Sequence, residues 1–87
     1  MTDTQDIRLK KLLFRSQHRG TRESDLLLGG FAAANLATMT PEQLDRYEAL
    51  LEENDADLID WITGRSAPPV SRDHDILNLL VNFRLKT

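Results

Sequence analysis

Apolar residues recur at helical spacing along almost the whole chain, and this pattern most constrains the fold. No stretch of five or more residues alternates strictly between apolar and polar side chains, and valine is rare. Spacings of three and four residues gather apolar side chains on one helix face, whereas a half-buried strand requires alternation. The sequence therefore predicts an all-α protein, a small bundle of about five short helices. Because the chain has only 87 residues, we expect one domain spanning residues 1–87.

Caps and breakers divide the chain into five expected helices. They run from about 6 to 19, 22 to 36, 41 to 53, 55 or 57 to 63, and 71 or 73 to 86. We expect Met1 to Asp6 to be frayed and the chain near Pro68 and Pro69 to be an extended link, since two prolines cannot continue a helix. The last helix, from about Arg72 to Lys86, is apolar around most of its circumference, which suits either a buried helix or one that covers a partner.

Local signals support these boundaries. Gly20 suits a left-handed residue at the end of the first helix, and Thr21 suits the N-cap of the second. Gly29 and Gly30 indicate a close helix crossing or a kink, since no Gly-Lys-Ser/Thr sequence follows them as in a phosphate-binding loop. The sequence Thr-Pro-Glu-Gln at residues 40–43 predicts an N-cap, a proline in the first helical turn and a capping box.

Charge is unevenly distributed along the chain. Residues 1–22 carry six basic and two acidic side chains, whereas residues 23–63 carry one basic and ten acidic side chains. The acidic middle argues against a nucleic-acid partner, because it repels a phosphate backbone. No signal sequence or membrane-spanning stretch is evident, so we expect no membrane insertion and a bacterial cytoplasmic location.

No arrangement of residues indicates catalysis or metal binding. The chain has no cysteine, and His18 and His74 belong to no metal-ligand spacing. Asp73, His74 and Asp75 are typical of a helix start with favourable dipole charges. No nucleophile-elbow or calcium-loop pattern is present either. We therefore expect a protein that is not an enzyme, with no catalytic residues and no metal site.

The most distinctive polar cluster lies between the first two expected helices. It contains Arg19, Gly20, Arg22, Glu23 and Asp25. One interpretation is purely structural, since Arg19 at a helix end and Glu23 at a helix start both suit the helix dipole. The other is functional: a residue without a side chain lets a partner's backbone approach, and the charged groups around it offer hydrogen bonds.

Three stretches of the sequence resemble a known family. The stretch LLFRSQHRGTRE at residues 12–23 is similar to the Arg-Gly-x-x-Glu signature of the succinate dehydrogenase assembly factor 2 family, also called SdhE or the flavinator. Residues 44–53 resemble the family's Leu-Leu-Glu helix, and residues 55–62 resemble its Asp-x-Asp-Leu-x-x-Trp segment. The likeness covers roughly residues 8 to 65. His18 departs from the family's usual Arg or Lys.

The resemblance implies a helical FAD assembly factor, a chaperone that binds the flavoprotein subunit of succinate dehydrogenase, and sometimes of fumarate reductase. Such a protein promotes covalent attachment of FAD to a histidine of that partner. The cofactor would belong to the flavoprotein, with none bound stably by this chain, which is expected to be a monomer when free. The implied partner-binding residues are Arg19, Gly20 and Glu23, with Arg22, Asp25, Lys10 and Lys11 as neighbours.

Two other classes of function remain open from the sequence. An antitoxin-like or regulatory binding module would require a toxin as partner, and no residue pattern specifies one. A helix-turn-helix DNA-binding protein would need a basic recognition helix, which the third, fourth and fifth expected helices do not supply.

Overall fold

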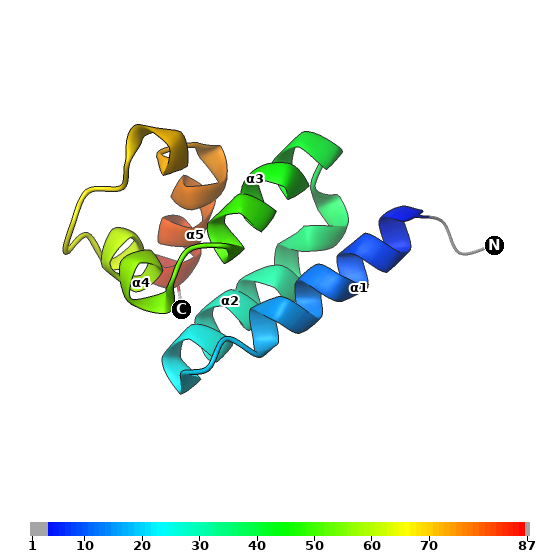
Figure 1. Ribbon diagram of the computed structural model, residues 1–87, viewed down its shortest axis with the longest axis horizontal. Coiled ribbons are helices and arrows are strands. Elements are labelled where there is room, and N and C mark those ends of the chain that lie inside the picture. The colour runs from blue at the N-terminus through cyan, green and yellow to red at the C-terminus, as the bar shows by residue number, and fades with distance from the viewer. Residues whose placement is uncertain (1–3, 87) are drawn as a thin grey trace. The chain divides into compact units, whose positions relative to one another are not determined.

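The computed structural model describes residues 4–86, which form five α-helices and two short 3₁₀ turns, with no strand in that range (Figure 1). The prediction of an all-α protein with about five helices is confirmed. Contacts within the chain divide it into two compact units, and the boundary in the sequence falls between Met39 and Thr40. The prediction that all 87 residues act as one domain stays a prediction.

The first unit is a pair of helices that pack against each other. Helix α1 spans Thr4–Gln17, α2 spans Arg22–Asn35, and a 3₁₀ turn, η1, continues over Leu36–Thr38. Ser16 is fully buried and its hydroxyl donates a hydrogen bond of 2.7 Å to the carbonyl of Leu12, so a polar group enters this core at little cost. The buried apolar side chains of the unit are Leu12, Leu28, Phe31, Ala32, Leu36 and Met39.

Gly29 explains how closely the two helices of this unit approach. A Cβ atom at this position would lie 3.1 Å from Cγ of Gln17 and 3.7 Å from the carbonyl oxygen of Ser16. The predicted close crossing is therefore confirmed at Gly29, which is buried. Gly30 is exposed and lies within the same uninterrupted helix.

The second unit contains three helices. Helix α3 spans Pro41–Leu51, α4 spans Asp55–Thr63, η2 spans Val70–Arg72, and α5 spans Asp75–Lys86. Both α3 and α4 pack against α5. The apolar residues of α3 at helical spacing, Leu44, Tyr47, Leu50 and Leu51, are all buried. The core of the unit consists of Leu44, Tyr47, Leu50, Leu51, Leu58, Ile62, Ile76, Leu77 and Leu80.

Several predicted helix signals are confirmed in detail. Thr40 and Gln43 form the capping box, with the Gln43 N–H donating to the Thr40 hydroxyl at 3.2 Å and the Thr40 N–H donating to the Gln43 side chain at 3.0 Å. The hydroxyl of Thr21 accepts from the N–H of Ser24 as an N-cap. Gly64 closes α4 in the left-handed conformation, with a φ of 80°.

Two predicted boundaries were wrong. The first helix begins at Thr4 and ends at Gln17, because a bent segment, and not the last helical turn, leads to Gly20. Of the frayed start expected for Met1 to Asp6, residues 1–3 lie outside the described residues, whereas residues 4–6 are helical. The last helix begins at Asp75 and not at Ser71 or Asp73, because residues 70–72 form η2.

The η2 turn is held by an ion pair that the sequence pattern did not indicate. Nε of Arg72 lies 2.8 Å from Oε2 of Glu53, just after α3, and both side chains are mostly buried. Before this turn, the extended link predicted around Pro68 and Pro69 is confirmed, because Pro69 has extended backbone angles.

Three large apolar side chains of the first unit are exposed. Phe14 is 62% exposed on α1, Leu26 is 67% exposed on α2, and Ile7 is 46% exposed. Phe14 lies off the helix face that buries Leu12 and Ser16, because it is two residues from each of them, and residues two apart point to different sides of a helix. An apolar pattern alone therefore overestimated the core of the first unit.

Candidate functional site

The corner between α1 and α2 brings together the residues of the predicted signature. Gly20 has a φ of 110°, in the region that residues with a side chain rarely adopt. The chain reverses here within four residues, 18–21, so α1 and α2 can pack side by side. The positive φ predicted for Gly20 is therefore confirmed. Gly20 lies three residues after the end of α1, however, and not directly at its last turn.

Asp25 braces this corner from within α2. The main-chain N–H of Arg19 donates a hydrogen bond of 2.5 Å to Oδ1 of Asp25. Asp25 is half-buried and lies in the first turn of α2, where a carboxylate also suits the positive end of the helix dipole. Asp25 is one of the residues predicted to contact a partner, and one of its carboxylate oxygens stabilises the corner.

The rest of the corner faces solvent. Gly20, Arg22 and Glu23 are exposed, and Arg19 is half-buried. The exposed backbone at Gly20 is therefore flanked by a guanidinium and a carboxylate from the first turn of α2. Such a surface can accept an approaching main chain and form charge-assisted hydrogen bonds beside it.

Two open grooves lie within the first unit, one near the corner and one farther along the helices. The groove near the corner contains Asp25, Leu26 and Gly29; its full lining is Gln17, Asp25, Leu26, Gly29, Gly30 and Ala33. The second groove is lined by Leu9, Lys10, Leu13, Ala32, Ala33, Leu36 and Ala37. Lys10 and Lys11 are exposed on α1, two helical turns before the corner.

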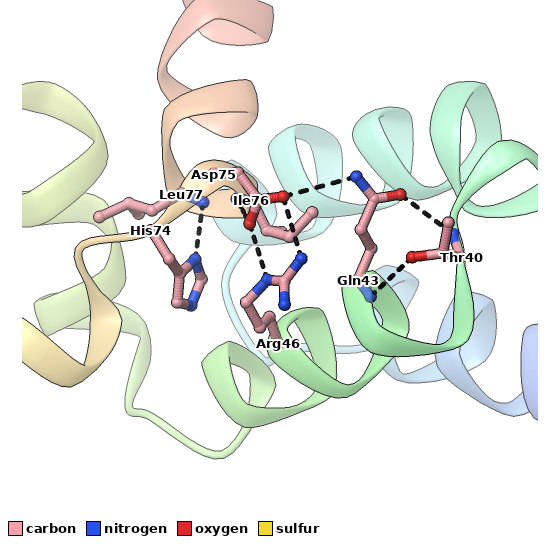
Figure 2. Close-up of polar contacts among 7 residues, drawn as sticks. All are labelled: Thr40, Gln43, Arg46, His74, Asp75, Ile76 and Leu77. Atoms are coloured by element: carbon pink, nitrogen blue, oxygen red, sulfur yellow. Dashed lines mark hydrogen bonds and ion pairs between the residues drawn. The ribbon is translucent and has the colours of Figure 1, made fainter.

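A second polar cluster joins α3 to the start of α5 (Figure 2). Nε and one terminal nitrogen of Arg46 donate to the two oxygens of Asp75 at 2.7 and 3.1 Å, and the Gln43 amide reaches the same carboxylate at 3.5 Å. Asp75 Oδ1 also accepts from the N–H of Ile76. The carboxylate thereby connects the capping box of α3 to the first turn of α5.

His74 caps α5 in the same cluster. Its Nδ1 accepts a hydrogen bond of 3.3 Å from the N–H of Leu77, so the cap within the predicted helix-start cluster at residues 73–75 is His74, and the helix begins at Asp75 (Figure 2). Nε2 of His74 is buried and has no hydrogen-bond partner among the described residues. Nδ1 of His74 therefore stabilises the start of α5, whereas Nε2 is enclosed by the surrounding residues.

The pKa values in this cluster reflect the same contacts. Hydrogen bonds from Arg46 hold the pKa of Asp75 below its usual value, and the Asp75 carboxylate raises the pKa of Arg46. Burial lowers the pKa of His74, with Arg46 and Arg72 acting in the same direction and Asp75 opposing them. These shifts are explained by an ion pair and a buried cap.

Neither a cluster of metal ligands nor a membrane-spanning helix is found in the described part of the chain. Within residues 4–86, no three His, Asp or Glu side chains come together as metal ligands would. No helix in the described part of the chain combines the length and the apolar character needed to cross a bilayer.

Comparison with known proteins identifies a matching family. The family described as "Flavinator of succinate dehydrogenase" matches residues 10–84. This match extends past residue 65, where the resemblance from motifs ended, and so includes most of α5. The family match therefore includes the chain after Pro69 as far as residue 84.

Individual relatives of the chain carry names of the same family. The chain is 45% identical over 74 residues to a protein of Acetobacter pasteurianus named FAD assembly factor SdhE, covering 85% of this chain and 68% of that protein. It is 43% identical over 82 residues to the mitochondrial succinate dehydrogenase assembly factor 2 of Candida glabrata, covering 90% of this chain and 54% of that protein. The corresponding protein of Dictyostelium discoideum is 41% identical over 71 residues, covering 82% of this chain and 50% of that protein.

The chain thus spans about half the length of the mitochondrial relatives and about two thirds of the bacterial one. By the extent of the family match and the identity to these relatives, the chain belongs to the family of flavinators of succinate dehydrogenase.

Proposed function

We propose that this protein is an FAD assembly factor that binds the flavoprotein subunit of succinate dehydrogenase and promotes covalent attachment of FAD to it. The observation that carries the proposal is the family match over residues 10–84, which includes the α1–α2 corner. The proposed contact surface consists of Arg19, Gly20, Arg22, Glu23 and Asp25, with Lys10 and Lys11 beside it. Fumarate reductase, which has a related flavoprotein subunit, is a second proposed client.

In this proposal the chain acts by binding and supplies no reacting group. A binding protein favours one conformation of its partner only by its difference in affinity for the alternatives, at about 1.4 kcal/mol for each tenfold change in population. The assembly factor would hold the flavoprotein in the arrangement in which its own histidine and FAD react.

We further propose that FAD remains with the flavoprotein. FAD-binding folds commonly hold the pyrophosphate at a glycine-rich turn between a strand and a helix. The described part of this chain has helices and turns only, and its open grooves are lined mainly by leucine, alanine and glycine. The residues present therefore do not fit FAD as a resident group.

We also propose that the protein acts as a monomer in the cytoplasm.

The experiment is to produce the flavoprotein subunit in a host that lacks its own assembly factor, with and without this chain. Covalently bound FAD is measured as fluorescence of the denatured subunit in a gel. We expect strong fluorescence only when the chain is present, and weak fluorescence when it carries Gly20→Arg. Equal covalent loading with and without the chain would overturn the proposed function.

A further inference from the structure

An exposed aromatic pair joins the last turns of α1 to the first residue of the corner. The rings of Phe14 and His18 are stacked, with centroids 4.0 Å apart and planes inclined by 20°. Both side chains are exposed, and Phe14 is 62% exposed. His18 immediately precedes Arg19, so the pair is continuous with the proposed contact surface.

The two residues of the pair are also linked by a hydrogen bond. Nδ1 of His18 lies 2.8 Å from the carbonyl oxygen of Phe14. Because a carbonyl oxygen only accepts, Nδ1 must carry the proton and donate, which leaves Nε2 as the ring nitrogen that a partner can engage. A preorganised aromatic side chain loses little conformational entropy on binding, which is why such residues often dominate the energy of protein interfaces.

The surroundings of the pair indicate the chemistry of its partner. Lys10 and Phe14 are four residues apart and lie on one side of α1, with Lys11 beside them, and His18 stacks on Phe14 just after the helix ends. Residues 4–22 contain six basic side chains and one acidic side chain. A surface complementary to this face is apolar where it meets the aromatic pair and acidic around it.

We infer that the Phe14–His18 pair is an anchor for the flavoprotein subunit, inserting into an apolar pocket bordered by carboxylates and extending the contact surface from the corner along α1 to Lys10 and Lys11. This inference rests on the proposed function, because it names a further part of the same interface. It also gives Lys10 and Lys11 a common role with the corner, since the aromatic pair lies between them and Arg19.

The test measures binding of the purified chain to flavoprotein subunit prepared without covalent FAD, by calorimetry or biolayer interferometry. The variants are Phe14→Ala, His18→Ala, the double variant and Phe14→Tyr. Matched controls are Val70→Ala and Ile7→Ala, since Val70 is 93% exposed in the second unit and Ile7 lies at the far end of α1. Thermal unfolding of each variant separates loss of binding from loss of folding.

We expect Phe14→Ala to weaken binding about tenfold or more and His18→Ala to weaken it by roughly threefold, as for a central and a supporting interface residue. The double variant should lose less than the product of the two, because the residues act as one anchor. Phe14→Tyr and both controls should bind like the unaltered chain. Raising the salt concentration should weaken binding of the unaltered chain and of Phe14→Ala in parallel, because the aromatic contribution is apolar.

Two results would overturn the inference, and they are distinguishable. If Phe14→Ala and His18→Ala bind within twofold of the unaltered chain while Gly20→Arg does not bind, the corner is the interface and the aromatic pair is not part of it. If the unaltered chain itself fails to bind the flavoprotein subunit, the proposed function fails and the anchor with it.

Discussion

The main-chain N–H of Arg19 and the carboxylate of Asp25 are hydrogen bonded across the corner between α1 and α2. The contact joins the two sides of the turn around Gly20, so the geometry of the proposed contact surface depends on a residue that belongs to it. Binding and stability are consequently linked at this corner, and variants must be compared for both.

Replacing Asp25 should reveal its bracing role. Asp25→Ala leaves the Arg19 N–H without its acceptor, and we expect the free energy of unfolding to fall by about 1 kcal/mol. Asp25→Asn retains an oxygen acceptor and should lose only a few tenths of a kcal/mol, from the weaker interaction with the helix dipole. Urea unfolding followed by circular dichroism measures both. Equal losses in the two variants would show that charge, and not the hydrogen bond, stabilises the corner.

Two substitutions of Gly20 distinguish the effect of backbone strain from the effect of a large side chain at the interface. Its φ of 110° is unfavourable for any residue with a side chain, so Gly20→Ala and Gly20→Arg should both lower the free energy of unfolding by roughly 1–2 kcal/mol. Only Gly20→Arg should abolish binding to the flavoprotein, because only its side chain occupies the approach path. Calorimetric binding assays check this, and a complete loss with Gly20→Ala would assign the defect to the backbone instead.

The two adjacent glycines of α2 should respond in opposite ways to substitution. Gly29→Leu places a large side chain against Gln17, where a Cβ atom alone would already be 3.1 Å from Cγ, and should cost about 1–3 kcal/mol. Gly30→Ala lies at an exposed helical position and should stabilise the chain by about 0.5–1 kcal/mol through helix propensity. Thermal and urea unfolding measure both changes. A destabilising Gly30→Ala would mean that this position also needs glycine for packing.

His74 should make stability depend on pH below neutrality. Burial lowers its pKa in the folded state, so the unfolded chain binds the proton first as the pH falls below about 6.5. Stability is therefore fully present above that pH and decreases between it and the lower pKa of the folded state. Protonation also removes the Nδ1 acceptor that caps α5. Urea unfolding at pH 7.5, 6.5 and 5.5 should show this decrease.

The control for this prediction is His74→Asn, which keeps a short polar N-cap and does not titrate. Its stability should change less between pH 7.5 and 5.5 than that of the unaltered chain. Asp75 does not contribute in this range, since its lowered pKa places its loss of stability below pH 3.8. An unchanged slope in His74→Asn would show that another group controls the response.

The sequence by itself determined the helices and most of their ends. The capping box at Thr40 and Gln43, the N-cap at Thr21 and the left-handed Gly64 depend on residues at most four positions apart. Such short-range hydrogen bonds and steric limits act within one turn of chain, so the order of residues is enough to predict them. The signature around Gly20 was recognised instead by its resemblance to a known family, which its consecutive residues make visible in the sequence.

Only the tertiary structure decided which polar and apolar groups meet across longer stretches. The start of the last helix depended on the Arg72–Glu53 ion pair and on the cap by His74, the first of which joins residues 19 positions apart. The exposure of Phe14 depended on which side of α1 packs against α2, which helical spacing leaves undecided when apolar residues occur on several sides. The bracing of the corner by Asp25 likewise required the folded turn, since a carboxylate reaches a main-chain N–H six residues away only after the chain reverses.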